Sequence, residues 1–162
     1  MSSQALRTYL NDHLAGSVAA LELLDHLADL HPDPDRKQFF IGLHAEVQED
    51  QKVLQRLLVQ IGGEESAVRK AAAWLTEKFG QAKLRLDDLG DGQLRVLEAI
   101  ETVALGIQGK LGLWRALAAV SDRIPQLQGV DFPRLEQSAL QQHQRVEAQR
   151  LQTARAALTL EP

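Results

Sequence analysis

Hydrophobic residues recur every three or four positions through four long stretches of this chain, which is the spacing of one face of an α-helix. The pattern predicts long helices over about 3–30, 34–61, 93–120 and 131–158, and a shorter helix over about 66–83. In the first stretch the apolar face is formed by Leu6, Leu10, Leu14, Leu21, Leu24 and Ala28. The chain is therefore predicted to be helical over most of its length.

Proline, glycine and aspartate mark the expected helix boundaries. The HPDP segment over 31–34 ends the first helix, because a residue that precedes proline is disfavoured in the helical conformation. Asp33 or Asp35 can then cap the second helix, with a proline tolerated in its first turn. The pair Gly62 and Gly63 ends that helix, and the DDLGDG segment over 87–92 is predicted to be a turn.

The second long stretch contains the segment LHAEVQEDQKVLQRLLVQIGG, residues 43–63, in which acidic and histidine residues precede a leucine-rich half and a glycine stop. This segment resembles the second helix of bacterial ferritin-like families of uncharacterised function, and the order of the helices resembles theirs as well. The resemblance implies one all-α domain over residues 1–162, an up-down four-helix bundle. The short extra helix would lie in the long crossover between the second and third long helices.

Composition narrows the class of protein. The 162 residues are 44% apolar but only 4% aromatic, which favours helices packed through aliphatic side chains. The formal net charge of −4 argues against a nucleic-acid partner, which would require a basic stripe. The chain has no cysteine, which excludes disulfides and thiolate ligands. The sequence shows neither a signal peptide nor a run of about 18 apolar residues, so we expect no membrane partner and a cytoplasmic location.

Polar side chains interrupt the apolar face expected for the last long helix. Glu136, His143, Glu147 and Arg150 share that face, at helical spacing, with Ala139, Leu140, Leu151, Ala154 and Leu158. Buried charges are costly unless they are paired, hydrogen-bonded or bound to a metal. The stripe therefore predicts a functional site, a buried ion-pair network, or the edge of an incompletely closed bundle.

A metal centre is one interpretation of this stripe. Ferritin-like di-iron proteins use a Glu-x-x-His pair on each of two helices, and this chain has no such pair, so a complete di-iron site is not predicted. Asp50, His143 and Glu147 could still hold one iron, zinc or manganese ion, with Glu136 and His13 as further candidates.

Ion pairing is the alternative interpretation of the same residues. His143 and Glu147 could pair with each other, or Glu147 could pair with Arg150 or with Lys110. Asp50 lies within the apolar seam of the second helix, where it could face Arg150, Lys110 or His13. Loss of one partner of such a buried pair would destabilise the fold.

Three glycines interrupt the third long helix at three-residue spacing. Gly106, Gly109 and Gly112 each cost a helix about 1 kcal/mol relative to alanine, so a reason for them is expected. Close approach of another helix is the first interpretation, and the surrounding segment over 104–114 would then also form a dimer face. A kink, or a pocket lined by bare backbone, is the alternative.

These patterns favour a non-enzymatic protein that acts through an interaction or a small ligand, as a homodimer. No catalytic residue is assigned, because neither a phosphate-binding loop nor a defensible Ser/His/Asp arrangement occurs. The competing hypothesis is a metal-binding oxidoreductase or storage protein that uses the inward histidines and carboxylates.

Overall fold

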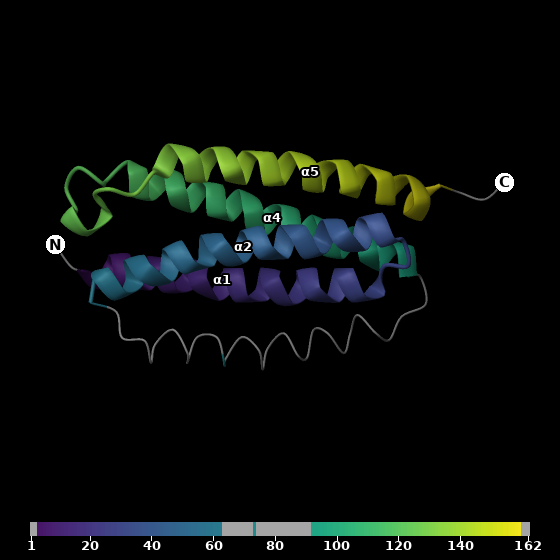
Figure 1. Cartoon of the computed structure of the whole chain (residues 1–162), viewed down its shortest axis with the longest axis horizontal. Coiled ribbons are helices and arrows are strands. Elements are labelled where there is room, and N and C mark those ends of the chain that lie inside the picture. Colours follow the sequence, from purple (N-terminus) through teal and green to yellow (C-terminus); the bar gives the residue numbers. More distant parts are fainter. Residues whose placement is uncertain (1–2, 63–72, 74–91, 160–162) are drawn as a thin grey trace.

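The computed structural model describes residues 3–62, 73 and 92–159. Within them the chain forms four long helices and a short 3₁₀ helix, η1 (Pro125–Leu127), and contains no strand (Figure 1). The long helices are α1 (Ser3–Leu30), α2 (Pro34–Gln60), α4 (Gly92–Ala118) and α5 (Phe132–Leu158). The predicted all-α bundle of long helices is thus confirmed. The predicted helix over 66–83 and the turn that precedes Gly92 lie outside the described residues, apart from the helical Ala73.

Local side-chain chemistry explains where these helices begin and end. The Asp33 carboxylate caps α2 by accepting a hydrogen bond of 2.9 Å from the backbone N–H of Asp35. Asp131 caps α5 in the same way, accepting from the N–H of Arg134 at 3.0 Å. After α2, Gly62 adopts a φ of 81°, a conformation that side chains with a Cβ rarely adopt. The predicted boundaries are therefore set by nearest neighbours in sequence.

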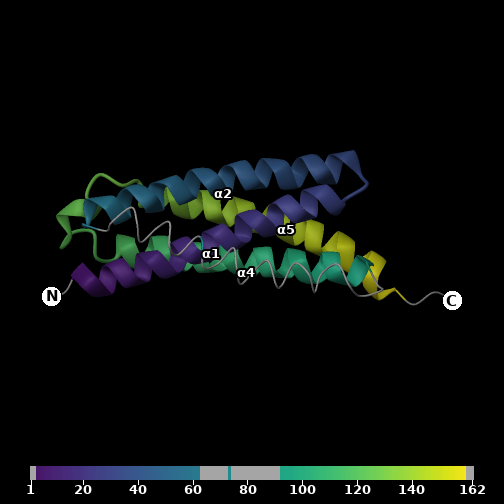
Figure 2. The ribbon, with the colours of Figure 1, turned by 90° about the horizontal axis from the view of Figure 1, so that it is seen from below.

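The helices pack as two antiparallel hairpins. α1 packs against α2, α4 packs against α5, and the two hairpins meet along α1 and α4 (Figures 1 and 2). α2 ends at the end of the bundle where α1 begins, whereas α4 begins at the opposite end (Figure 1). α2 and α4 therefore run parallel, and the segment that joins them must connect opposite ends of the bundle.

The core between the hairpins is mainly aliphatic, as the composition predicts. Trp114 and Phe40 are the largest of the fully buried side chains, and the remainder are leucines and one isoleucine: Leu10, Leu14, Leu24, Leu27, Leu43, Leu58, Ile100, Leu113, Leu117 and Leu127. Full burial of such a side chain stabilises a fold by about 1.5–3 kcal/mol. The apolar face predicted for α1 supplies Leu10, Leu14 and Leu24 of this set.

The prediction of the inner face of α5 is wrong in part, because the face that is buried is rotated about the helix axis from the predicted face. Ala139 is buried as predicted, but Leu140, Leu151 and Leu158 are 42%, 47% and 62% exposed. The other buried residues of α5 are Phe132, Gln142, Val146 and Thr153. Polar Gln142 and Thr153 can be buried because each has a hydrogen-bond partner on another helix. The stripe of Glu136, His143, Glu147 and Arg150 consequently lies half-buried at the edge of the bundle.

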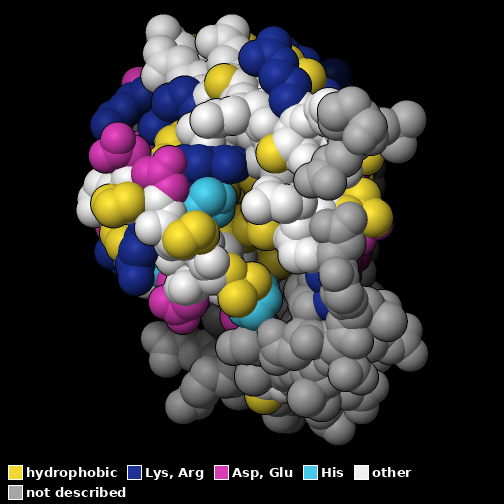
Figure 3. Space-filling model, turned by 90° about the vertical axis from the view of Figure 1, so that its right-hand side faces the viewer, with side chains coloured by type: hydrophobic (Ala, Val, Ile, Leu, Met, Phe, Trp, Pro, Cys, Tyr) yellow, Lys and Arg dark blue, Asp and Glu magenta, His cyan; other side chains and the backbone are white. Residues whose placement is uncertain are grey.

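The end of the bundle at which α1 leads into α2 carries side chains of both charges. Figure 3 views this end and shows histidines among acidic, basic and apolar groups. One contact here joins His44 Nε2 to the Asp25 carboxylate at 3.4 Å. Among the described helices, none combines the length and the apolar character that crossing a membrane would require.

Candidate functional site

A lysine from α4 lies at the meeting point of three helices. Lys110 Nζ donates to Oδ2 of Asp50 on α2 at 2.5 Å and also donates to Oε1 of Gln142 on α5. The Gln142 amide nitrogen donates in turn to the same Asp50 oxygen at 3.3 Å. Lys110, Asp50 and Gln142, which we call the Lys110 network, thus tie α2, α4 and α5 together.

The Lys110 network is shielded from water. The side chains of Lys110 and Asp50 are 13% and 11% exposed, and Gln142 is 1% exposed. Burial lowers the pKa of Lys110, and the charge of Asp50 and its hydrogen bond oppose that shift. The predicted pairing of Asp50 with Lys110 is confirmed. Gln142 was missed, although its spacing from Ala139 and Val146 places it on the same helix face.

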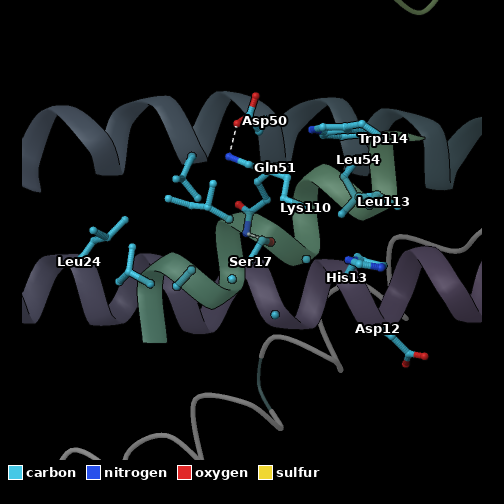
Figure 4. A pocket seen from close by; sticks show the side chains of 17 residues that line it. Asp12, His13, Ser17, Leu24, Asp50, Gln51, Leu54, Lys110, Leu113 and Trp114 are labelled. Carbon is cyan, nitrogen blue, oxygen red and sulfur yellow. Dashed lines mark hydrogen bonds and ion pairs between the residues drawn. The ribbon is translucent and has the colours of Figure 1, made fainter. Parts of the chain in front are cut away.

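A cavity of about 210 Å³ lies between α1, α2 and α4, against the Lys110 network. Most of its wall is apolar, and Asp50 and Lys110 form part of the polar remainder (Figure 4). Leu24, Leu54 and Ile107 are among the apolar residues that line it.

The glycines of α4 help to form this cavity. A Cβ placed on Gly106, Gly109 or Gly112 would meet no described atom within 4 Å outside its own helix neighbourhood. No described side chain or backbone crowds these three positions, so the expectation that they permit close helix approach stays a prediction. Gly106 and Gly109 line the cavity, as does Gly16 of α1, which matches the alternative of a pocket lined by bare backbone.

The polar groups of the cavity differ in how well they are paired. Gln51 Nε2 donates to Ser17 Oγ at 2.9 Å, and that hydroxyl donates to the Leu14 carbonyl at 2.7 Å. His13 packs edge-on against Tyr9, with ring centroids 4.7 Å apart, and burial lowers the pKa of His13. The imidazole is therefore neutral at pH 7, since an unperturbed histidine titrates near pH 6.5.

Trp114 is the exception among these polar groups. The residue is 1% exposed, and its buried Nε1–H has no hydrogen-bond partner among the described residues. Figure 4 shows the ring nitrogen on the edge that is turned toward the side of Lys110 and Asp50. A buried donor without a partner is rare in native proteins.

The residues predicted to bind a metal have other partners in this fold. Asp50 belongs to the Lys110 network, and Glu147 accepts two hydrogen bonds of 2.7 Å from Arg150, which confirms the predicted Glu147–Arg150 pair. Those hydrogen bonds are the main reason why the pKa of Glu147 is lowered. Glu136 accepts from Arg115 at 3.2 Å.

The two predicted histidine ligands lie on different helices. His13 lies on α1 in the cavity wall, whereas His143 lies on α5 close enough to Glu147 for its charge to lower the pKa of that carboxylate. Over residues 3–62 and 92–159, no three histidine, aspartate or glutamate side chains are grouped so as to hold a metal ion. Metal binding by the predicted set stays a prediction.

Comparisons of the chain with protein-family models, with curated proteins and with solved structures found no match. The resemblance to ferritin-like proteins thus depends on the helix order and the 43–63 segment. Function has to be inferred from the Lys110 network and the adjoining cavity.

Proposed function

We propose that this chain is a ferritin-like bundle that binds a small organic molecule in its interior and does not carry out metal chemistry. The helix directions support the ferritin-like part of this proposal. One long connection joins α2 to the parallel α4, and a bundle with one long crossover is the ferritin-like arrangement.

The Lys110 ammonium is the reason for proposing a function without a metal ion at the centre of the bundle. It supplies a fixed positive charge between groups from two other helices, the Asp50 carboxylate at 2.5 Å and the Gln142 amide oxygen. In di-iron proteins of this architecture, metal ions neutralise the inward carboxylates of the bundle. A metal on Asp50 would have to displace the ammonium, because two cations cannot share a buried oxygen without strong repulsion.

The cavity beside the Lys110 network is the observation that carries the proposal. An apolar cavity of about 150 Å³ is known to bind benzene, so about 210 Å³ accommodates a ring with a small substituent. Ligand sites are typically apolar with a few placed polar groups, which is also the composition of this wall.

A homodimer in the cytoplasm remains part of the proposal. The exposed Leu105 of α4, 73% accessible, and Leu140 of α5, 42% accessible, are apolar side chains that a second copy of the chain could cover. The competing proposal is metal-dependent redox or storage chemistry at Asp50, His143 and Glu147, which requires stoichiometric metal.

Blocking the cavity tests the proposed function. Gly109 and Gly112 lie one helical turn apart on α4, and a Cβ meets no described atom at either, but only Gly109 lines the cavity. Calorimetric titration of the full chain with isopropylbenzene should detect saturable binding, which Gly109→Leu abolishes. Gly112→Leu is the matched control and should leave the affinity unchanged. Equal affinities in the two variants, or no binding by the unmodified protein, would contradict the proposal.

A further inference from the structure

The buried N–H of Trp114 indicates which chemical group a ligand of this cavity must carry. Ser17 and Gln51 already bond to each other, and Lys110 already donates to Asp50 and Gln142. Trp114 Nε1–H, by contrast, is buried without a partner among the described residues. An indole N–H is a donor only, so its partner must be a hydrogen-bond acceptor.

The charges around the cavity indicate the charge of the ligand. Asp12, Asp50 and Lys110 are the cavity-lining groups that are charged at neutral pH, and the Lys110 charge is already matched by Asp50 at 2.5 Å. His13, also in the wall, is neutral at pH 7 because burial lowers its pKa. The described part of the wall therefore offers an anion no unpaired positive charge.

The size and composition of the wall complete the description. Leu24, Leu54, Ile107 and the bare backbone at Gly106 and Gly109 present mainly apolar surface to about 210 Å³. We infer that the cavity binds a neutral, mainly apolar molecule of about the size of a substituted benzene ring, with one acceptor that pairs with Trp114 Nε1–H. This inference rests on the proposed function, because it names the ligand class of the same cavity.

Three probes of nearly the same shape separate the elements of this inference. Isopropylbenzene is neutral and has no acceptor, acetophenone is neutral and carries one carbonyl acceptor, and benzoate is anionic. In nitrogen-15 NMR spectra of the full chain, acetophenone should move the indole N–H proton of Trp114 downfield, and isopropylbenzene should not. The chain has two tryptophans, so a Trp74→Phe variant identifies which indole resonance belongs to Trp114.

Affinities measured by calorimetry give the second readout. Trp114→Phe should weaken acetophenone binding by about threefold to tenfold, the usual contribution of a neutral hydrogen bond. The same substitution should change the affinity for isopropylbenzene much less, which controls for the altered size of the cavity. The NMR measurement uses the unmodified residue, so it tests the hydrogen bond from Trp114 Nε1–H even if Trp114→Phe folds poorly.

Each outcome bears on the inference. A downfield shift with acetophenone alone, together with the selective effect of Trp114→Phe, supports it. Binding of both neutral probes without that shift, as a resident buried water on the indole would produce, overturns the inference and leaves the proposed function standing. Tighter binding of benzoate than of acetophenone overturns the assignment of a neutral ligand. If no probe binds, both the inference and the proposed function fail.

Discussion

Replacement of Lys110 by methionine tests the Lys110 network directly. The substitution keeps a long apolar side chain and removes the ammonium, so the Asp50 carboxylate, 11% exposed, is left with the 3.3 Å hydrogen bond from Gln142. Breaking a buried pair in this way typically destabilises a protein by about 3–5 kcal/mol, because one charge stays buried without its counter-ion. A domain has only about 5–15 kcal/mol in total, so the variant should be marginally folded.

Urea unfolding measures this loss. With a denaturant dependence of about 2 kcal/mol per molar urea, a loss of about 4 kcal/mol lowers the midpoint by about 2 M. The double variant Asp50→Leu with Lys110→Met should recover most of that stability, since a buried ion pair replaced by apolar residues is often neutral or stabilising. An unchanged midpoint for Lys110→Met, or a double variant no more stable than the single one, would refute the reasoning.

The pH dependence of the two proteins should differ. Burial lowers the pKa of Lys110, so the folded state releases that proton at a lower pH than the unfolded state does. The unmodified protein therefore gains stability from this group as the pH rises toward the unfolded value of about 10.4. The Lys110→Met variant lacks this gain, so its stability should not show the same rise with pH.

Three further predictions concern the other residues of the sequence pattern. Glu147→Gln should barely change the denaturation midpoint at pH 7, because the pair with Arg150 is at the surface. Since that pair lowers the pKa of Glu147, its small contribution is present at neutral pH and is lost on acidification below the ordinary glutamate value. A midpoint shift as large as that of Lys110→Met would contradict this prediction. The unmodified protein should lose stability as the pH falls below about 6.5, since burial lowers the pKa of His13, and His13→Asn should reduce that loss. Chemical denaturation at several pH values measures the loss, and identical pH profiles for the two proteins would count against the prediction. Protein loaded with iron, zinc or manganese and then desalted should retain less than one ion per chain, and stoichiometric metal that His143→Ala abolishes would restore the competing metal site.

Features fixed by neighbouring residues could be predicted from the sequence. The bounds of α1 and the caps at Asp33 and Asp131 follow from proline, aspartate and apolar spacing within a few residues. The rotation of α5 about its axis could not be predicted from the sequence. A helical spacing fits the exposed Leu140 and Leu151 as well as the buried Ala139 and Val146. Which face is buried depends on partners supplied by other helices.

The candidate site could be predicted in part for the same reason. Asp50 lay within an apolar seam, which indicated a buried carboxylate, but a choice among Lys110, Arg150 and His13 required the packing of α4 against α2 and α5. Gln142 carries no charge and drew no attention, although it completes the Lys110 network. That Gly106 lines a cavity became clear only from the arrangement of α1, α2 and α4.

The dimer is tested separately by light scattering at several protein concentrations. A mass of two chains that falls toward one on dilution is expected, and a concentration-independent monomer would reject that part of the proposal. Leu105→Glu should favour the monomer if this exposed leucine of α4 lies in the contact.

Binding of a small neutral molecule inside the bundle is the central claim, and the glycine amides report on it most directly. Glycine amide resonances fall in their own region of a nitrogen-15 spectrum. Titration with isopropylbenzene should therefore shift Gly16, Gly106 and Gly109, which line the cavity, along a saturable curve. Gly42 and Gly129 lie outside it and serve as controls. The absence of any saturable shift, or equal shifts in the control glycines, would contradict the claim.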